Sequence, residues 1–155
     1  MADRGSKRDA GSLFRVMLTC NLGAVRQAAL SAREVLASQG AAEEDLSACE
    51  LALVEACNNA ILYVSNSGRQ EPIEIQLLSA GPDLEIHVID HTSGFEWPGQ
   101  LALPDTEAEH GRGLFIIQSL MDEVLYLRGQ NENHLIMRKS RMFWNADATL
   151  ISAEL

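Results

Sequence analysis

The stretch that decides the fold is AEEDLSACELALVEACNNAILYV, residues 42–64, which predicts one long helix. Its acidic first turn suits the positive end of a helix macrodipole, and apolar residues dominate the turns that follow. Glu55, Asn58 and Asn59 interrupt this apolar run. Polar groups placed there cost free energy if they are buried without partners. The helix therefore raises the question of what these three side chains face.

The flanking segments show the periodicities of strands and helices. Apolar residues alternate in SLFRVMLTC (12–20), which predicts a strand, and lie on one stripe in the helix that follows, which ends near Gly40. Two further alternating segments are joined by AGPD, which is typical of a hairpin turn. The predicted order is strand 12–20, helix 21–40, helix 42–64, turn 66–72, strands 73–79 and 84–90, an irregular segment 91–112, helix 113–124, and strands 124–129 and 134–140.

This order predicts an α+β fold, a two-layer sandwich in which helices cover one face of a mixed, mostly antiparallel sheet. We expect a flexible, polar N-terminal arm over residues 1–11 and a single domain over 12–140. The tail over 141–155 contains Phe143 and Trp144, which we expect to pack on the domain.

Composition excludes several classes of function. The chain has 155 residues, of which 46% are hydrophobic and 22% charged, and its formal net charge is −10. A strongly acidic chain is a poor partner for nucleic acid or an anionic membrane surface. No apolar run reaches the ~18 residues of a membrane span, and no apolar signal core follows the N-terminus. The three cysteines match no zinc spacing, so buried free thiols in a reducing cytoplasm are expected.

The spacing of Glu55 and Asn59 indicates a shared face. They are four residues apart, so they lie one above the other on the helix, and Asn58 is about 60° round from Glu55. A carboxylate beside a carboxamide can orient a hydroxyl group and supply oxygen ligands to a hard cation. The same pair could instead be partly buried and satisfied by a neighbouring loop, and the helix alone leaves both alternatives open.

Two other short motifs contain residues suited to a ligand. Asp90 ends an apolar strand in IDHTSGF (89–95), where it could accept a hydrogen bond from a ligand amine or simply close an Asx turn. In EHGRGLF (109–115), Gly111 and Gly113 lie directly before the predicted helix. Glycines there allow close backbone approach, helix N-termini bind phosphate, and Arg112 could add a charged contact. An ordinary turn with a solvated arginine is the alternative.

Together, these motifs resemble the asparagine box and the two glycine boxes of one ATP-binding superfamily. That superfamily includes DNA gyrase, a heat-shock chaperone family, the histidine kinases and a mismatch-repair ATPase, and it has the Bergerat-type ATP-binding fold. Within it, ELALVEACNNAI, VIDHTSGF and GRGLFIIQSLMDEV are most similar to the anti-sigma-factor serine kinases. The resemblance covers roughly residues 12–140.

The resemblance implies roles for individual residues. Asn59 would ligate a Mg²⁺ that bridges the ATP phosphates, and Glu55 would be the general base for a protein serine hydroxyl. Asp90 would bind the adenine amino group. The remaining implied contacts are Gly94 letting the turn approach the base, and Gly111 and Gly113 lining the phosphates beneath a lid of about residues 96–112. Thr92 departs from the family, which often has glycine there.

The function implied by this resemblance is that of a cytoplasmic, ATP-dependent serine kinase and anti-sigma factor. Such a protein sequesters a sigma factor and phosphorylates that factor's STAS-domain antagonist, and homodimerisation remains open. The alternative is a nucleotide-binding adaptor with little or no kinase activity. The presence of both Glu55 and Asn59 favours the kinase, whereas Thr92 favours the adaptor.

Overall fold

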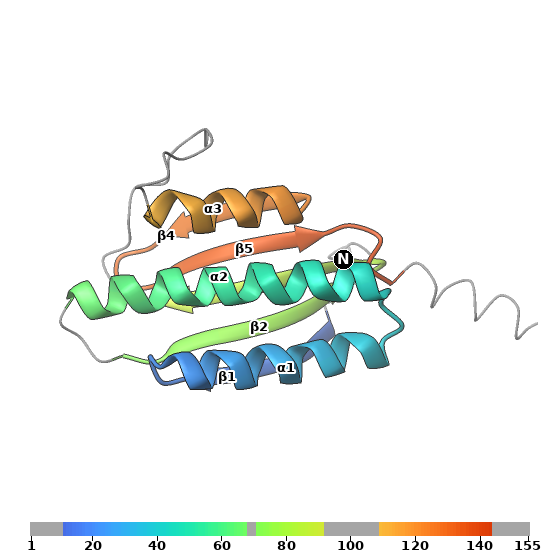
Figure 1. Cartoon of the computed structure of the whole chain (residues 1–155), viewed down its shortest axis with the longest axis horizontal. Helices are drawn as coiled ribbons and strands as arrows, with labels where there is room; N and C mark the ends of the chain where they lie inside the picture. The colour runs from blue at the N-terminus through green and yellow to red at the C-terminus, as the bar shows by residue number, and fades with distance from the viewer. Residues whose placement is uncertain (1–10, 68–70, 92–108, 144–155) are drawn as a thin grey trace, which may run out of the picture.

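The computed structural model describes residues 11–67, 71–91 and 109–143, which form a sheet and three helices (Figure 1). The elements in chain order are β1 (Gly11–Leu18), α1 (Leu22–Ser38), α2 (Glu43–Ser67), β2 (Ile73–Ala80), β3 (Asp83–Asp90), α3 (Glu109–Leu120), β4 (Glu123–Arg128) and β5 (Asn133–Lys139). None of the helices in the described part of the chain is long and apolar enough to cross a membrane.

The sheet has five strands in the order β1-β2-β3-β5-β4. All four neighbouring pairs of described strands are antiparallel. The predicted sheet is mostly antiparallel but also includes parallel pairs. The β2–β3 turn has Gly81 at φ +62°, a conformation that glycine adopts without strain. Because β5 inserts between β3 and β4, the start of β5 lies beside the end of β3, where Asp90 pairs with Asn133.

The three helices cover one face of this sheet, as the sequence predicts (Figure 1). Strand residues that point toward them are buried, among them Ile75, Ile86 and Met137, each 0% exposed. The helices pack small or apolar side chains against these strand residues, including Ala32, Ala52 and Cys57. Burial of this apolar area provides the main driving force for the fold and fixes how α2 lies across the sheet.

Three helix boundaries differ by three or four residues from those predicted. The sequence ends the second helix at residue 64, but α2 continues to Ser67. The predicted helix 113–124 instead spans Glu109–Leu120. A glycine destabilises a helix interior by ~1 kcal/mol relative to alanine, so the sequence predicts a helix start only at residue 113. In the structure, packing against α2 overrides that preference and α3 starts earlier. The end is earlier because the N–H of Asp122 donates to the Arg138 carbonyl at 2.9 Å and Glu123 pairs with Arg138 in the sheet.

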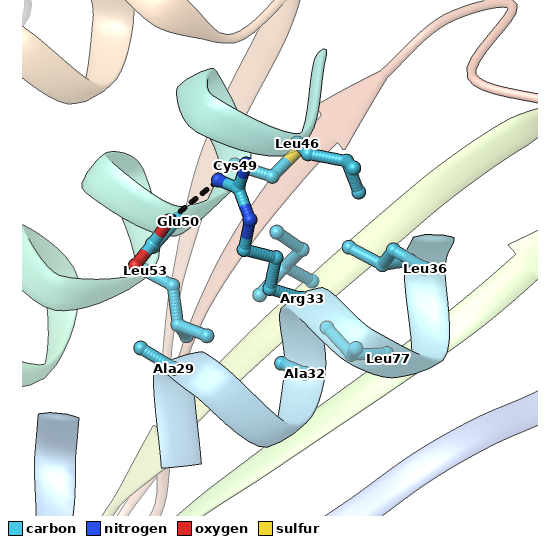
Figure 2. A pocket seen from close by; sticks show the side chains of 10 residues that line it. Ala29, Ala32, Arg33, Leu36, Leu46, Cys49, Glu50, Leu53 and Leu77 are labelled. Carbon is cyan, nitrogen blue, oxygen red and sulfur yellow. Dashed lines mark hydrogen bonds and ion pairs between the residues drawn. The ribbon is translucent and has the colours of Figure 1, made fainter. Parts of the chain in front are cut away.

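A small pocket of about 10 Å³, partly open to solvent, lies between α1 and α2 (Figure 2). Across its mouth Arg33 donates to Glu50 at 2.7 Å, and Arg33 also pairs with Glu43. The other lining residues are mostly apolar: Ala29, Ala32, Leu36, Leu46, Cys49, Leu53, Leu77 and Ile86. This space is below the usual 300–1,000 Å³ of ligand sites and offers no polar atom without a partner among its described lining residues. It is a gap between alanine-rich helix surfaces.

The chain after β5 remains part of the core for a few residues. Met142 and Phe143 are buried, at 2% and 7% exposure, and the N–H of Phe143 donates to the Pro82 carbonyl at 3.0 Å. The packing expected for Phe143 is therefore observed, whereas Trp144 and the rest of the tail lie outside the described residues.

The three cysteines are free, as predicted. Cys49 and Cys57 are buried, and burial raises the pKa of each thiol to about 12. Cys20 is half-buried rather than buried, and its Sγ lies 3.4 Å from the Glu71 carbonyl oxygen. Protonated thiols in an apolar core are unreactive side chains, so Cys49 and Cys57 serve packing.

Candidate functional site

Glu55 and Asn59 of α2 face α3 at the position of Gly113. A Cβ atom built on Gly113 would lie 3.1 Å from Glu55 Oε2, 3.1 Å from Asn59 Nδ2 and 3.2 Å from Asn59 Oδ1. Both polar side chains therefore converge on one point of the α3 backbone. The structure thus brings Gly113 together with two residues that lie more than fifty positions earlier in the chain.

The absence of a side chain at Gly113 determines this arrangement. Distances of 3.1 to 3.2 Å from a Cβ to three polar atoms are tighter than nine in ten observed Cβ contacts, so with any other residue Glu55 or Asn59 would have to shift by a few tenths of an ångström. Gly113 is itself buried and lies inside α3. Gly111, which was predicted to precede the helix, is helical, and Gly113 lies one turn inside α3 instead of at the helix start.

The polar groups of this part of α2 lack partners within the described residues. Asn58 Oδ1 and Asn59 Nδ2 are buried without a hydrogen bond, and Glu55 makes no hydrogen bond or ion pair there. An unsatisfied buried polar atom costs about 1–3 kcal/mol. The neighbouring-loop alternative raised by the sequence finds no support in the described residues. Half-buried groups kept unsatisfied at this cost are expected where a ligand completes their bonding.

Asp90 lies at the end of β3 and is only 4% exposed. Asn133, which is fully buried, donates from Nδ2 to Asp90 Oδ1 at 3.0 Å. Their strands pair at this position, so the amide fixes the orientation of the carboxylate. The sequence prediction misses Asn133, because it starts the last strand at residue 134 and leaves 130–133 to the connection between the two strands. The available signal was an asparagine at the first position of the last strand.

The other predicted site residues are only partly placed. Gly111 and Arg112 belong to the first turn of α3, and the structure does not describe their side chains. Gly94, Thr92 and most of the predicted lid lie outside the described residues. The last four lid positions, 109–112, are helical, which corrects the lid boundary. Four N–H groups at the start of α3 have no intrahelical acceptor and can bind an anion.

The Glu55–Asn59 pair fits a hard cation such as Mg²⁺. Carboxylate and carboxamide oxygens are preferred ligands of this ion, and the missing Cβ of Gly113 keeps their approach open. A cation would be bound through Asn59 Oδ1, because the amide nitrogen is a donor and cannot ligate a metal. The described residues contain no group of three or more His, Cys, Asp or Glu side chains able to hold a metal. A cation here would therefore take its remaining ligands from phosphate oxygens and water.

The fold and this site define the class of protein. A family model described as the histidine kinase-like ATPase domain matches residues 18–139, and the chain belongs to that family. The superfamily recognised from the sequence motifs is thereby confirmed. The matched residues include Glu55, Asn59, Asp90, Gly113 and Asn133.

The chain is also similar in sequence to one particular protein kinase. The serine-protein kinase RsbW of Bacillus pumilus is 32% identical over 101 residues, which are 58% of this chain and 62% of that protein. The chain therefore spans less than two thirds of the relative's length. This similarity supports the resemblance to the anti-sigma-factor serine kinases.

Two solved structures share the fold. The RsbU and RsbW domains of a Mycobacterium tuberculosis protein align with a TM-score of 0.62 at 20% identity, covering 82% of this chain and 32% of that one. The SiaB–SiaC complex of Pseudomonas aeruginosa contains a chain that aligns with a TM-score of 0.67 at 12% identity, covering 87% and 94%. They confirm the two-layer α+β architecture.

Proposed function

We propose that this protein is an ATP-dependent serine kinase and anti-sigma factor, which binds a sigma factor in the cytoplasm and phosphorylates a STAS-domain antagonist. The observation that carries the proposal is the convergence of Glu55 and Asn59 on Gly113. The similarity to RsbW, a serine-protein kinase, supports the reaction class. Phosphoryl transfer depends mainly on positioning and charge stabilisation, so a small set of side chains suffices.

In this proposal Glu55 is the general base. It makes no hydrogen bond or ion pair within the described residues, so its carboxylate is available to accept the proton of a serine hydroxyl. The serine oxygen then bonds to the γ-phosphorus, the bond from that phosphorus to the bridging oxygen breaks, and ADP leaves with the electron pair. Asn59 would hold Mg²⁺, which neutralises charge on the phosphates when bound.

Asp90 would select adenine through its exocyclic amine. The carboxylate is buried, and Asn133 holds one of its oxygens at 3.0 Å. A fixed acceptor favours adenine, which presents a donor, over guanine, which presents an acceptor at the equivalent position. Gly94, Gly111 and Arg112 would complete the contacts with the base and the phosphates.

The test is phosphate transfer from labelled ATP·Mg²⁺ to STAS-domain proteins encoded beside this chain in its genome. Label on the antagonist, absent when its acceptor serine is changed to alanine, is the expected result. An antagonist that binds in the presence of ATP but never receives label would overturn the kinase assignment. That outcome would favour the alternative, a nucleotide-dependent adaptor, which Thr92 also favours.

A further inference from the structure

The two edges of the sheet, β1 and β4, differ in how well they are protected against pairing with another chain (Figure 1). The pairing of β1 with β2 shifts register between Ser12 and Phe14, and the side chain of Arg15 in β1 is 67% exposed. A bulge and an exposed charge are common means of keeping an edge strand unpaired. In contrast, β4 pairs with β5 without a register shift and contains no lysine or proline, and its charged residues, Glu123 and Arg128, lie only at its ends. The β4 strand is therefore the regular, unprotected edge of the sheet.

The β4 strand also presents large apolar side chains on the face of the sheet that the helices leave open. Val124 and Tyr126 pack against the core, so Leu125 and Leu127, which alternate with them, point to the opposite face. Leu125 is 43% exposed and Leu127 is 55% exposed. Ile136 of β5 lies opposite Leu125 in the sheet and extends this apolar surface. We name Leu125, Leu127 and Ile136 the β4 patch. Exposed apolar residues on a regular edge strand favour association with a further strand.

The sequence of β4 is complementary to a second copy of itself. If two β4 strands pair antiparallel around Tyr126, Leu125 lies opposite Leu127 of the second copy, and Leu127 lies opposite its Leu125. Directly opposite apolar side chains stabilise a strand pair. In the same arrangement Glu123 at the start of one strand lies beside the end of the other strand, which carries Arg128. One acidic and one basic residue thus become neighbours at each end of the pair.

The charge of β4 also favours a second copy at this edge. The formal net charge of the chain is −10, so two copies repel each other over most of their surfaces. The β4 strand has one glutamate and one arginine, and its formal charge is zero. The outer edge of β4 is therefore a part of the surface where two acidic molecules can meet without bringing net charge together.

We infer that β4 is the interface between two copies of this chain, and that the five-stranded sheets of both copies join there into one continuous sheet. No other described strand pairs with the outer edge of β4, so its backbone is available for ladder hydrogen bonds to the second copy. A two-fold axis perpendicular to the sheet relates the copies, and it keeps both helix layers on the same side of the joined sheet. The inference does not depend on the proposed function, because it uses no residue of the Glu55–Asn59 site.

The first experiment measures self-association of the full chain by sedimentation equilibrium over a range of concentrations. Leu127→Lys is the test, because a lysine on an edge strand opposes pairing and would meet Leu125 of the second copy. Met17→Lys is the matched control, since Met17 is similarly exposed, at 51%, and belongs to the opposite edge strand β1. Leu127→Lys should raise the dimer dissociation constant by about tenfold or more, while Met17→Lys stays within about twofold of the wild type. Unchanged circular dichroism spectra would show that both variants are folded.

The second experiment tests the register by disulfide cross-linking with oxidised glutathione. A mixture of Leu125→Cys chains and Leu127→Cys chains places the two new thiols directly opposite each other, so a covalent dimer should form. Leu125→Cys chains alone place them on a diagonal of about 7–8 Å, which is too far for a disulfide, so little product should form. Of the native cysteines, Cys49 and Cys57 are buried, and wild-type protein gives the background from Cys20.

Each outcome supports or overturns the inference. Weaker self-association in Leu127→Lys alone, together with cross-linking only in the mixture, would support it. A wild-type chain that is monomeric at every concentration would overturn it, and so would equal dissociation constants for Leu127→Lys and the wild type. If Met17→Lys breaks the dimer and Leu127→Lys does not, the copies meet at the β1 edge and the inference fails. Cross-linking of Leu125→Cys chains alone, without product in the mixture, would exclude the inferred register.

Discussion

Two glutamates of α2, five residues apart, have opposite surroundings. Glu50 accepts a hydrogen bond from Arg33 at 2.7 Å, and the hydrogen bonds of Glu50 and Glu43 raise the pKa of that guanidinium. Glu55 has no partner in the described residues and lies next to Asn59, whose buried Nδ2 is also without one. The fold itself satisfies Glu50, whereas the described residues satisfy neither Glu55 nor the Asn59 amide nitrogen, and we propose that a ligand does so.

This difference teaches how to separate structural from functional polar residues in one helix. At Glu50 the hydrogen bond from Arg33 offsets the free-energy cost of removing the carboxylate from water. At Asn58 and Asn59 no hydrogen bond from the described residues offsets the cost of burying the amide atoms. Natural proteins retain such a cost mainly where binding repays it. Exchanging single groups on each side of the helix can therefore break or sharpen the comparison.

The largest effect is expected from Glu55→Gln. Removing a general base lowers the rate of phosphoryl transfer by ~10²–10⁴-fold, while ATP·Mg²⁺ binding changes little because the side chain keeps its shape. Single-turnover kinetics with the STAS-domain antagonist would measure it, and Glu50→Gln is the matched control. Equal rates in Glu55→Gln and the wild type would remove Glu55 from the base role.

Asn59→Ala should weaken Mg²⁺-dependent ATP binding by about 10–100-fold, because a cation ligand is lost. Thermal stability should not fall, since the substitution also removes a buried amide without a partner. Affinities measured with and without Mg²⁺ decide the case, with Asn58→Ala as the neighbouring control. An equal loss under both conditions would argue against the metal role.

Asp90→Asn should weaken ATP binding and narrow the preference for ATP over GTP. A buried carboxylate opposed to the guanine oxygen is mismatched by ~1–3 kcal/mol, or about five-fold to over a hundred-fold in affinity, and an amide can rotate to relieve it. Asp83→Asn at the other end of β3 is the control, since it touches the Arg141 N–H instead. Calorimetry with both nucleotides measures the preference. Wild-type protein that binds ATP and GTP equally would contradict the adenine assignment.

Gly113→Ala should reduce turnover by about tenfold, because the new methyl group displaces the Glu55 carboxylate or the Asn59 amide. Alanine is the better helix former by ~1 kcal/mol, so a lower melting temperature is not required for the loss. Turnover and thermal unfolding should be followed together. Full activity in a stable variant would mean that the contact with α2 does not position these groups.

The smallest effect is expected from Glu50→Gln, which breaks the pair with Arg33. Both side chains are about one quarter to one third exposed, at 25% and 32%, so solvent screens their interaction. We expect the melting temperature to fall by no more than about 3 °C, with unchanged kinase activity. A loss of activity comparable to that of Glu55→Gln would erase the contrast between the two halves of α2.

The sequence by itself determined the helices, the strands and the shared face of Glu55 and Asn59. These follow from periodicity along the chain, because side-chain direction repeats every 3.6 residues in a helix and every two in a strand. It also determined the superfamily, since the motifs around Asp90 and Gly113 occur in their expected order.

Only the tertiary structure decided how these pieces meet. The insertion of β5 between β3 and β4 places Asn133 beside Asp90, and the close approach of α3 to α2 places Gly113 against Glu55 and Asn59. The same approach keeps Gly113 inside a helix whose local propensity opposes a glycine. These contacts join residues that are 43 or more positions apart. Local periodicity carries no information about such distant pairs, because the packing of the whole core selects them.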